Sequence, residues 1–163
     1  MKKSRSSDIA KQALGAYILN ESGMPRLATA IGLPQEASDP EYLKAVKHSA
    51  AHALFPLKES PTMELNGRGP EGDSMLHVAC AWGDLRAVRL LIEAGCDIES
   101  RDEMEVTPLS RAVNGRFVDI VEFLVSHGAN SDTKSAFGYS PREWALQMGY
   151  SEIVEALQKG QPK

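Results

Sequence analysis

The stretch 73–157, DSMLHVACAWGDLRAVRLLIEAGCDIESRDEMEVTPLSRAVNGRFVDIVEFLVSHGANSDTKSAFGYSPREWALQMGYSEIVEAL, repeats one pattern three times. The hydroxyl residues Ser74, Thr107 and Ser140 are spaced 33 residues apart. Other columns keep that step: Val88, Val121 and Val154, and Leu91, Leu124 and Leu157. A constant step across several columns indicates an internal structural repeat.

Each repeat reads as two short helices. The hydroxyl residue is a suitable N-cap, and Pro108 and Pro141 follow at the first helical position, where a missing N–H costs nothing. A glycine turn comes next, at Gly83, Gly115 or Gly149. The second helix has apolar residues at helical spacing and ends at a glycine, Gly95 or Gly128. One such pair cannot bury its apolar face alone, so the pattern predicts a stack of pairs, a solenoid.

Four short motifs carry a family resemblance. They are Leu-His at 76–77, Thr-Pro-Leu at 107–109, Ile-Val-Glu-Phe-Leu at 120–124 and Gly-Ala-Asn at 128–130. With the 33-residue period, this stretch resembles three ankyrin repeats. The resemblance implies an all-α ankyrin-repeat solenoid at 69–163, with repeats at about 69–101, 102–134 and 135–160.

Three residues depart from the repeat pattern. Arg116 stands in the column of Gly83 and Gly149, which predicts a different turn between the helices of the second repeat. Arg142 and Gln158 replace apolar residues of the first two repeats, which predicts a polar outer face on the third. The array is therefore expected to end there, followed by a frayed tail at 161–163.

Residues 1–68 are interpreted as an N-terminal helical extension that begins with a disordered basic tail at 1–7. Helices are expected at 8–19, at 25–31, and from Ser38 or Asp39 to the residues before Pro56. The apolar side of this third helix is predicted to hold Leu43, Val46, Ala50 and Ala53 or Leu54. We favour an extension that covers the first repeat; the alternative is a degenerate fourth repeat at 41–73.

The amino-acid composition restricts the classes of protein to which the chain can belong. Of the 163 residues, 42% are hydrophobic and 25% charged, which is typical of a globular chain, and the formal net charge of −4 disfavours nucleic acid as a partner. Only Cys80 and Cys96 are cysteines, and no apolar run is long enough to span a membrane. We therefore expect a cytoplasmic protein without a membrane partner, either a monomer or a weak dimer.

Candidate catalytic and metal-binding residues are few. His77 and Cys80 share one helical face, but they fit the structural columns of an ankyrin repeat better than a nucleophilic pair. His48 and His52 have ligand spacing without a third ligand, and Glu103 and Glu105 lie in an expected exposed turn. No phosphate-binding GK[ST] loop or HExxH motif is present. The sequence thus predicts no catalytic residue, cofactor or metal.

The resemblance implies that partners dock on a concave surface made by the turn tips and the first helices. The residues of this chain expected on that surface are Arg68, Glu71, Asp73, Trp82, Arg101, Glu103, Met104, Asn114, Lys134, Phe137, Tyr139 and Met148. Aromatic, Met and Arg side chains are enriched at interface hot spots. The competing interpretation is that Trp82 packs on the N-terminal extension and that Phe137 and Tyr139 close their own hairpin.

The function predicted from these features is that of a non-enzymatic protein–protein interaction module, an adaptor or inhibitor. The exposed carboxylates would favour a partner with a basic or mixed surface. In the alternative, the repeats are a platform, and residues 1–68 carry a separate activity or bind nucleic acid or an anionic surface.

Overall fold

The computed structural model describes residues 38–54 and 63–159. These ranges contain helices and no strand. The helices are α2 (Asp39–Leu54), α3 (Met75–Ala81), α4 (Leu85–Glu93), α5 (Pro108–Gly115), α6 (Val118–Ser126), α7 (Pro141–Gln147) and α8 (Ser151–Lys159). The helices predicted at 8–19 and 25–31, and the predicted tails at 1–7 and 161–163, lie outside the described residues.

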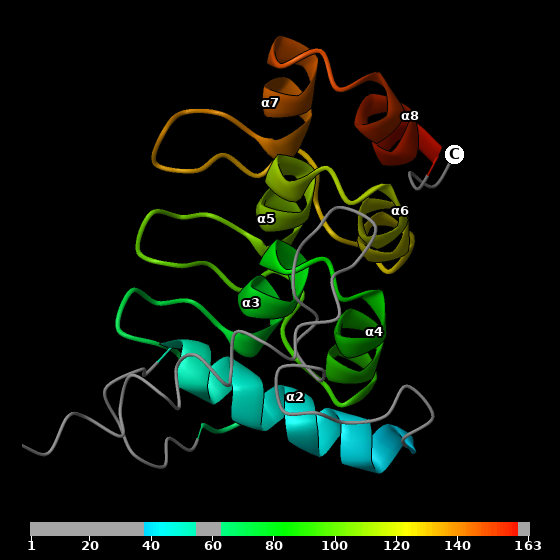
Figure 1. The fold of residues 1–163 in the computed structure, drawn as a ribbon. Coiled ribbons are helices and arrows are strands. Elements are labelled where there is room, and N and C mark those ends of the chain that lie inside the picture. Colours follow the sequence, from blue (N-terminus) through cyan, green and yellow to red (C-terminus); the bar gives the residue numbers. More distant parts are fainter. Residues whose placement is uncertain (1–37, 55–62, 160–163) are drawn as a thin grey trace, which may run out of the picture.

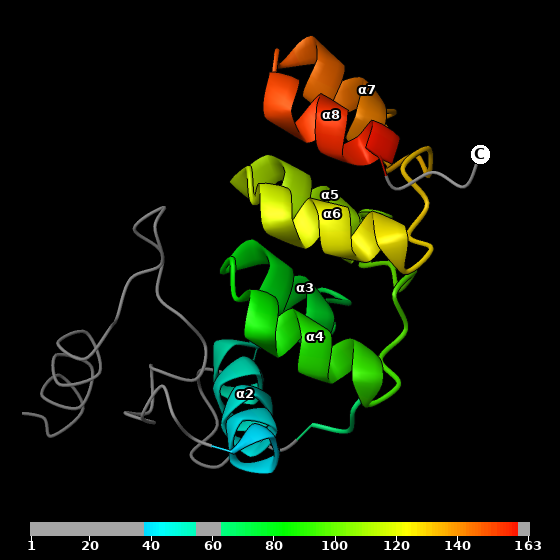
Figure 2. The same cartoon turned by 90° about the vertical axis from the view of Figure 1, so that its right-hand side faces the viewer.

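Three helix pairs stack in one direction. The first helices α3, α5 and α7 form one column, and the second helices α4, α6 and α8 form the other, while α2 lies across the bottom (Figure 1). The view in Figure 2 shows the pairs as successive layers. Contacts run within each pair and between neighbouring layers, which confirms the predicted all-α solenoid.

The caps form where the sequence places them. Ser74, Thr107 and Ser140 have extended backbones, and each side chain accepts a hydrogen bond from the backbone N–H three residues later. Pro108 and Pro141 occupy the first helical positions of α5 and α7. The three first helices therefore begin in equivalent ways, as predicted.

The turn of the second repeat corrects the expectation for Arg116. Its backbone takes the same left-handed conformation as Gly83 and Gly149, with φ of 61° against 70° and 68°. The second repeat therefore makes the same left-handed turn as the other two, although arginine stands in place of glycine. Gly115 serves a different purpose: a Cβ there would come within 2.3 Å of the Phe117 ring, so the glycine makes room for that ring.

Three hairpin-shaped connections lead into the first helices. The backbone N–H of Gly69, Asp102 or Ser135 donates to the carbonyl four residues later, at 2.7, 3.1 and 3.1 Å. Neighbouring hairpins are also joined, because Glu103 N donates to Glu71 O at 3.1 Å and Ala136 N to Met104 O at 2.9 Å. The hairpin tips therefore form a stacked edge beside α3, α5 and α7 (Figure 1).

Helix α2 covers the outer side of the first repeat, where it contacts α3 and α4. It is one continuous helix of 16 residues, whereas each repeat breaks into two short helices. The phenol of Tyr42 donates to the carboxylate of Asp84, the N-cap of α4, at 2.9 and 3.1 Å. This helix therefore supplies the partner layer that the first repeat needs, although the boundary between residues 68 and 69 remains a prediction.

The buried face of α2 differs from the predicted one. The structure buries Tyr42, Ala45, Val46, Ser49, Ala50 and Ala51. Of the residues predicted to face inward, Val46 and Ala50 do so, whereas Leu43 and Leu54 are half-buried and Ala53 is exposed. The face that α2 packs against α3 and α4 is therefore rotated from the predicted one and consists largely of small side chains, which apolarity alone did not reveal.

The last layer is polar in part. Gln158 is exposed as predicted, and Arg142 binds Asp132 and Ser131 at 2.8 and 2.6 Å. Leu146, however, is 59% exposed, although its equivalents Cys80 and Val113 are buried by a following layer. The outward face of α7 is therefore less polar than predicted.

Candidate partner-binding surface

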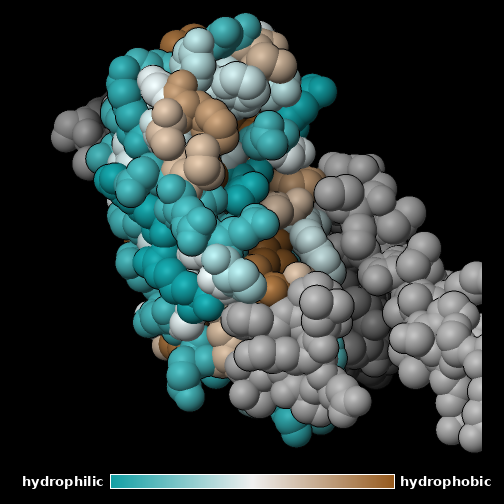
Figure 3. Space-filling model, turned by 90° about the vertical axis from the view of Figure 1, so that its left-hand side faces the viewer, coloured by the Kyte–Doolittle hydropathy of each residue, from teal (hydrophilic) through white to brown (hydrophobic). Residues whose placement is uncertain are grey.

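The candidate site is the face formed by the hairpin tips and the first helices (Figure 3). Most of it is hydrophilic, but apolar surface shows in its upper part and again at mid-height toward the right of the view. The large exposed apolar side chains on this face are Met104, Phe137, Tyr139 and Met148, with exposed fractions of 46, 65, 43 and 45%. Burying such side chains in an interface is favourable, and aromatic side chains are common hot spots.

The predicted surface residues are mostly on the outside. The exposed ones are Arg68, Glu71, Arg101, Glu103, Met104, Asn114, Lys134, Phe137, Tyr139 and Met148. Asp73 and Trp82 are half-buried, and Trp82 packs against the core. Trp82 therefore takes part in core packing, whereas its packing on the N-terminal extension and its place in an interface both stay predictions.

The basic side chains of this face, although exposed, bond to neighbouring groups of the same chain. Arg68 donates to the carbonyl oxygens of Gly72 and Arg101. Arg101 pairs with Glu105 at 2.7 Å, and Lys134 pairs with Glu143 at 3.2 Å. Within the described ranges, no ion pair engages the exposed carboxylates of Glu71 and Glu103. Arg68 is likewise in none of these ion pairs, so the two carboxylates outnumber the one cation that lacks an oppositely charged partner on this face.

We call the contact of α3, α5 and the hairpin 102–106 the first joint. Its centre is Asp102, whose Oδ1 accepts the backbone N–H groups of Met104 and Val106 at 2.8 and 2.9 Å. The other oxygen of Asp102 accepts from Arg111 at 2.9 Å, and Arg111 also reaches Asp73 at 3.1 Å. One buried carboxylate thus ties the hairpin to α5 and to the preceding hairpin.

His77 closes the first joint from the side of α3. Its Nδ1 accepts the backbone N–H of Ser74 at 3.1 Å, so Nε2 carries the proton and donates to Val106 O at 2.9 Å. Burial lowers the pKa of His77, and the carboxylates of Asp73 and Asp102 oppose this shift only in part. The residue is a neutral latch between layers, which confirms the structural interpretation of His77.

We call the contact of α5, α7 and the hairpin 135–139 the second joint. There Ser110 stands in the column of His77, and its short side chain bonds back to Thr107 Oγ1 at 3.1 Å. A hollow of about 510 Å³ opens at this joint. It is lined by Val106, Ser110, Arg111, Val113, Asn114, Ser135, Phe137, Tyr139, Ser140, Pro141 and Trp144. Ser110 is smaller than His77 and is one of the residues that border this hollow.

The hollow unites only part of the predicted surface. It brings together Asn114, Phe137 and Tyr139, whereas Trp82 and Met148 lie outside it. Sequence reasoning missed Trp144, whose ring centroid lies 6.0 Å from that of Tyr139. The available signal was the repeat column, in which Trp144 aligns with Arg111 and Val78, so the side chain at this position changes character from layer to layer.

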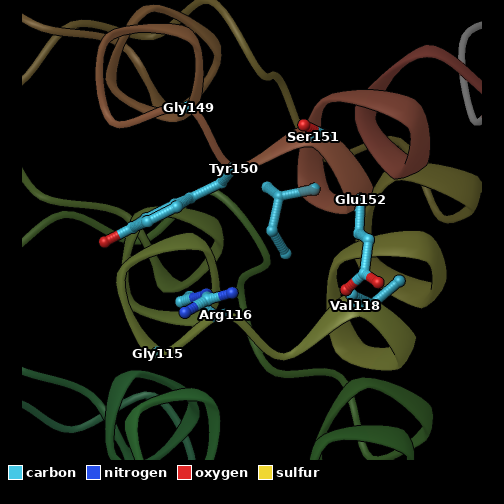
Figure 4. A pocket seen from close by; sticks show the side chains of 8 residues that line it. Gly115, Arg116, Val118, Gly149, Tyr150, Ser151 and Glu152 are labelled. Carbon is cyan, nitrogen blue, oxygen red and sulfur yellow. The ribbon is translucent and has the colours of Figure 1, made fainter.

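A second hollow, of about 530 Å³, lies between the helix turns of the second and third repeats (Figure 4). The Tyr150 ring lies above Arg116, 5.1 Å from its guanidinium carbon, and Glu152 points toward Val118. Arg116 and Tyr150 are thus engaged with each other in an internal cation–π contact. This hollow therefore offers less to a partner than the second joint does.

Candidate chemical groups elsewhere are structural. Cys80 is fully buried, and burial raises the pKa of its thiol far above the usual value; burial also raises the pKa of Cys96 to about 11. Such thiols are poor nucleophiles. The rings of His48 and His52 lie edge to face with centroids 4.4 Å apart, and across the described part of the chain no cluster of three metal-ligating residues forms.

No helix within the described ranges has both the length and the apolar character needed to cross a membrane. The residues to which the alternative function was assigned, 1–68, are described only at 38–54 and 63–68.

Comparisons with known proteins agree with this architecture. The family model for ankyrin repeats, in three copies, matches residues 76–163. The human protein phosphatase 1 regulatory subunit 27 is 38% identical over 86 residues, which cover 53% of this chain and 55% of that protein. The mouse B-cell lymphoma 3 protein homolog is 35% identical over 130 residues, covering 79% and 27%.

The serine/threonine-protein kinase VIK of Arabidopsis thaliana is 32% identical over 142 residues, covering 72% of this chain and 32% of the kinase. The chain thus spans little more than half of the first relative and about a third or less of the other two. The match to the phosphatase subunit is no longer than the repeat region, whereas the other two matches also cover residues outside 69–163. The names of the three relatives denote different activities.

Proposed function

The chain belongs to the ankyrin-repeat family, and we propose that it is a non-enzymatic adaptor or inhibitor that binds a partner protein on its hairpin face. Ankyrin repeats are protein–protein interaction modules, and one relative is named as a regulatory subunit of a phosphatase. Both cysteine thiols are buried and have raised pKa values, so neither Cys80 nor Cys96 is offered as a nucleophile in this proposal.

One observation carries this proposal. Phe137 and Tyr139 expose 65% and 43% of their surface beside an open hollow, on a face that is mostly hydrophilic. Exposed aromatic side chains around a concavity are typical of interaction sites in folded proteins. Phe137 is too exposed to contribute much to folding, and Tyr139, although its ring lies near Trp144, leaves a large part of its surface open, so we take binding as the reason for their position.

The same reasoning extends to compartment and assembly. Cys80 and Cys96 are buried and unpaired as thiols, which suits a reducing compartment such as the cytoplasm. The proposed binding species is a monomer, because a single copy presents the whole face.

The test is a pair of substitutions. The wild-type chain is used to capture its partner from the native source, the partner is identified by mass spectrometry, and its Kd is measured by calorimetry. We expect Tyr139→Ala to weaken binding by about 1–2 kcal/mol while the urea midpoint changes little. Glu93→Ala, on the exposed side of α4, serves as the control and is expected to bind normally.

Equal binding by Tyr139→Ala and the wild type would place the interface elsewhere. A loss of stability as large as the loss of affinity would instead assign Tyr139 to hairpin packing.

A further inference from the structure

We propose that the hollow at the second joint receives one apolar side chain from a peptide segment of the partner, and that a Lys or Arg beside it in that segment meets the carboxylates of the hairpin edge. This inference rests on the proposed function and adds the chemistry of the bound segment. It commits to a basic, apolar segment rather than to an acidic or purely polar one.

The residues that line the hollow favour an apolar side chain of the partner. The hydrophobic groups of Val106, Val113 and Pro141 lie together with the rings of Phe137, Tyr139 and Trp144 around the hollow. Rings from the hairpin and from α7 thus face one concavity. Its volume of about 510 Å³ is within the usual range for sites that accept small ligands or side chains.

Most polar groups of the hollow are already engaged. Arg111 is held by Asp73 and Asp102, Ser110 is bonded to Thr107, and Ser135 donates to Tyr139 O. A charged side chain entering the hollow would lose water and meet only the neutral, exposed amide of Asn114, which is costly. Entry of an apolar side chain avoids this loss.

The charge around the hollow selects the flanking residue. Arg111 faces two carboxylates, so this group alone has an excess of negative charge. The Arg101–Glu105 and Lys134–Glu143 pairs are neutral, while Glu103 on the adjoining tip is exposed and has no ion pair among the described residues. A Lys or Arg of the partner is therefore attracted to this edge, and an Asp or Glu is repelled.

The repeat itself provides the most specific variant. Ser110→His introduces the residue that fills the equivalent position of the first joint, where His77 Nε2 reaches the hairpin carbonyl. We expect the new imidazole to occupy the hollow and to exclude the anchor without unfolding the protein. Ser110→Ala, which leaves the space open, is the matched control.

The probe is a phage-displayed library of random dodecamer peptides, selected on the full-length wild-type chain. We expect the enriched peptides to share an apolar or aromatic residue with Lys or Arg nearby. Synthetic copies should lose at least about tenfold in affinity for Ser110→His and for Phe137→Ala, and little for Ser110→Ala. Glu103→Lys should weaken them several-fold, with a smaller effect at high salt.

Several outcomes overturn the proposal. Enriched peptides rich in Asp or Glu, or an absence of enrichment, would refute the proposed segment but leave binding of a folded partner intact. Peptides that bind Ser110→His as well as the wild type would refute the hollow. If light scattering shows a dimer that Ser110→His dissociates, the occupant is a second copy, and the basic segment is again refuted.

The native partner distinguishes this inference from the function on which it rests. A partner that loses affinity for Tyr139→Ala but not for Ser110→His would retain the hairpin face as the binding surface and eliminate the anchored segment. A partner whose affinity is unchanged by either variant would refute both the hairpin face as the binding surface and the anchored segment.

Discussion

The first and second joints have the same backbone arrangement, but their side chains differ: hydrogen bonds join the layers at the first, and a hollow lies at the second. Both contain a hairpin closed by the same backbone hydrogen bond, at 3.1 Å, and both hairpins precede a proline-initiated helix. In the first joint Asp102, Arg111 and His77 fill the space between hairpin and helices with hydrogen bonds. In the second, the equivalent residues are Ser135, Trp144 and Ser110, and a hollow remains.

The difference shows how a repeat protein separates stability from recognition. The backbone frame is held by caps, turns and buried apolar columns, which all layers share. The side chains at the joints are then free to differ from layer to layer. The first joint is used to hold layers together, and the second exposes the rings that we propose for binding.

The largest expected difference between the joints concerns Asp102. Asp102→Ala removes the acceptor for two backbone N–H groups and for Arg111 in a site where the carboxylate is 4% exposed. We expect a loss of about 3 kcal/mol in the free energy of unfolding, measured by urea denaturation. The matched change at the second joint, Ser135→Ala, is expected to cost less than about 1 kcal/mol. Equal losses would show that the two joints are equally structural.

A smaller contrast concerns the column of Trp82 and Met148. Trp82 is half-buried against the core, whereas Met148 is 45% exposed. We expect Trp82→Ala to reduce the free energy of unfolding by about 2 kcal/mol. Met148→Ala is expected to change it by no more than about 0.5 kcal/mol. If Trp82→Ala instead left stability unchanged and abolished partner binding, the first joint would also be part of the interface.

The smallest contrast is in pH dependence, at His77 and its third-repeat equivalent Glu143. Burial lowers the pKa of His77 below 6.5, so the unfolded chain binds this proton more readily than the folded one. The contribution of His77 to stability is therefore complete above pH 6.5 and is lost as the pH falls, at up to about 1.4 kcal/mol per pH unit. Urea midpoints of wild type and His77→Gln, measured across this range, isolate the effect.

Glu143 behaves differently. The hydrogen bond from the backbone N–H of Ser140, with a further contribution from Lys134, lowers the pKa of this exposed carboxyl from 4.5. The contribution of Glu143 to stability is therefore lost only in more acidic solution.

His52 does not disturb the comparison of wild type with His77→Gln. Its pKa is also lowered, through burial and His48, but His52 is present in both proteins and contributes equally to each. Parallel pH profiles for wild type and His77→Gln would contradict the proposed contribution of His77 to the pH dependence of stability.

Much of the fold followed from local patterns. The hydroxyl N-caps, the prolines at the first helical position and the 33-residue columns of Val and Leu predicted the three helix pairs that the structure shows. These features are readable because a cap bonds within one helical turn, and an apolar stripe is set by helical periodicity. The same local reasoning identified most of the exposed positions on the hairpin face, which has not yet been tested as a binding site.

Two kinds of error occurred. The turn at Arg116 was misjudged because the backbone N–H groups of Arg116 and Phe117 bond to the last carbonyls of α5, and these local bonds form with arginine as well as with glycine. The buried face of α2 and the exposure of Leu146 depend instead on other layers: α2 packs on α3 and α4, and no described layer covers the outer side of α7. These two outcomes are not properties of a single turn.

The sequence by itself determined the period, the helix boundaries and the family, because these depend on contacts between residues close in the chain. The tertiary structure decided which charges pair across the hairpins, that His77 seals one joint, and that Ser110, Tyr139 and Trp144 border a hollow at the next. The physical reason is that a cavity is a difference between the volumes of side chains from separate layers. Only when those layers are packed does the volume left between them become defined.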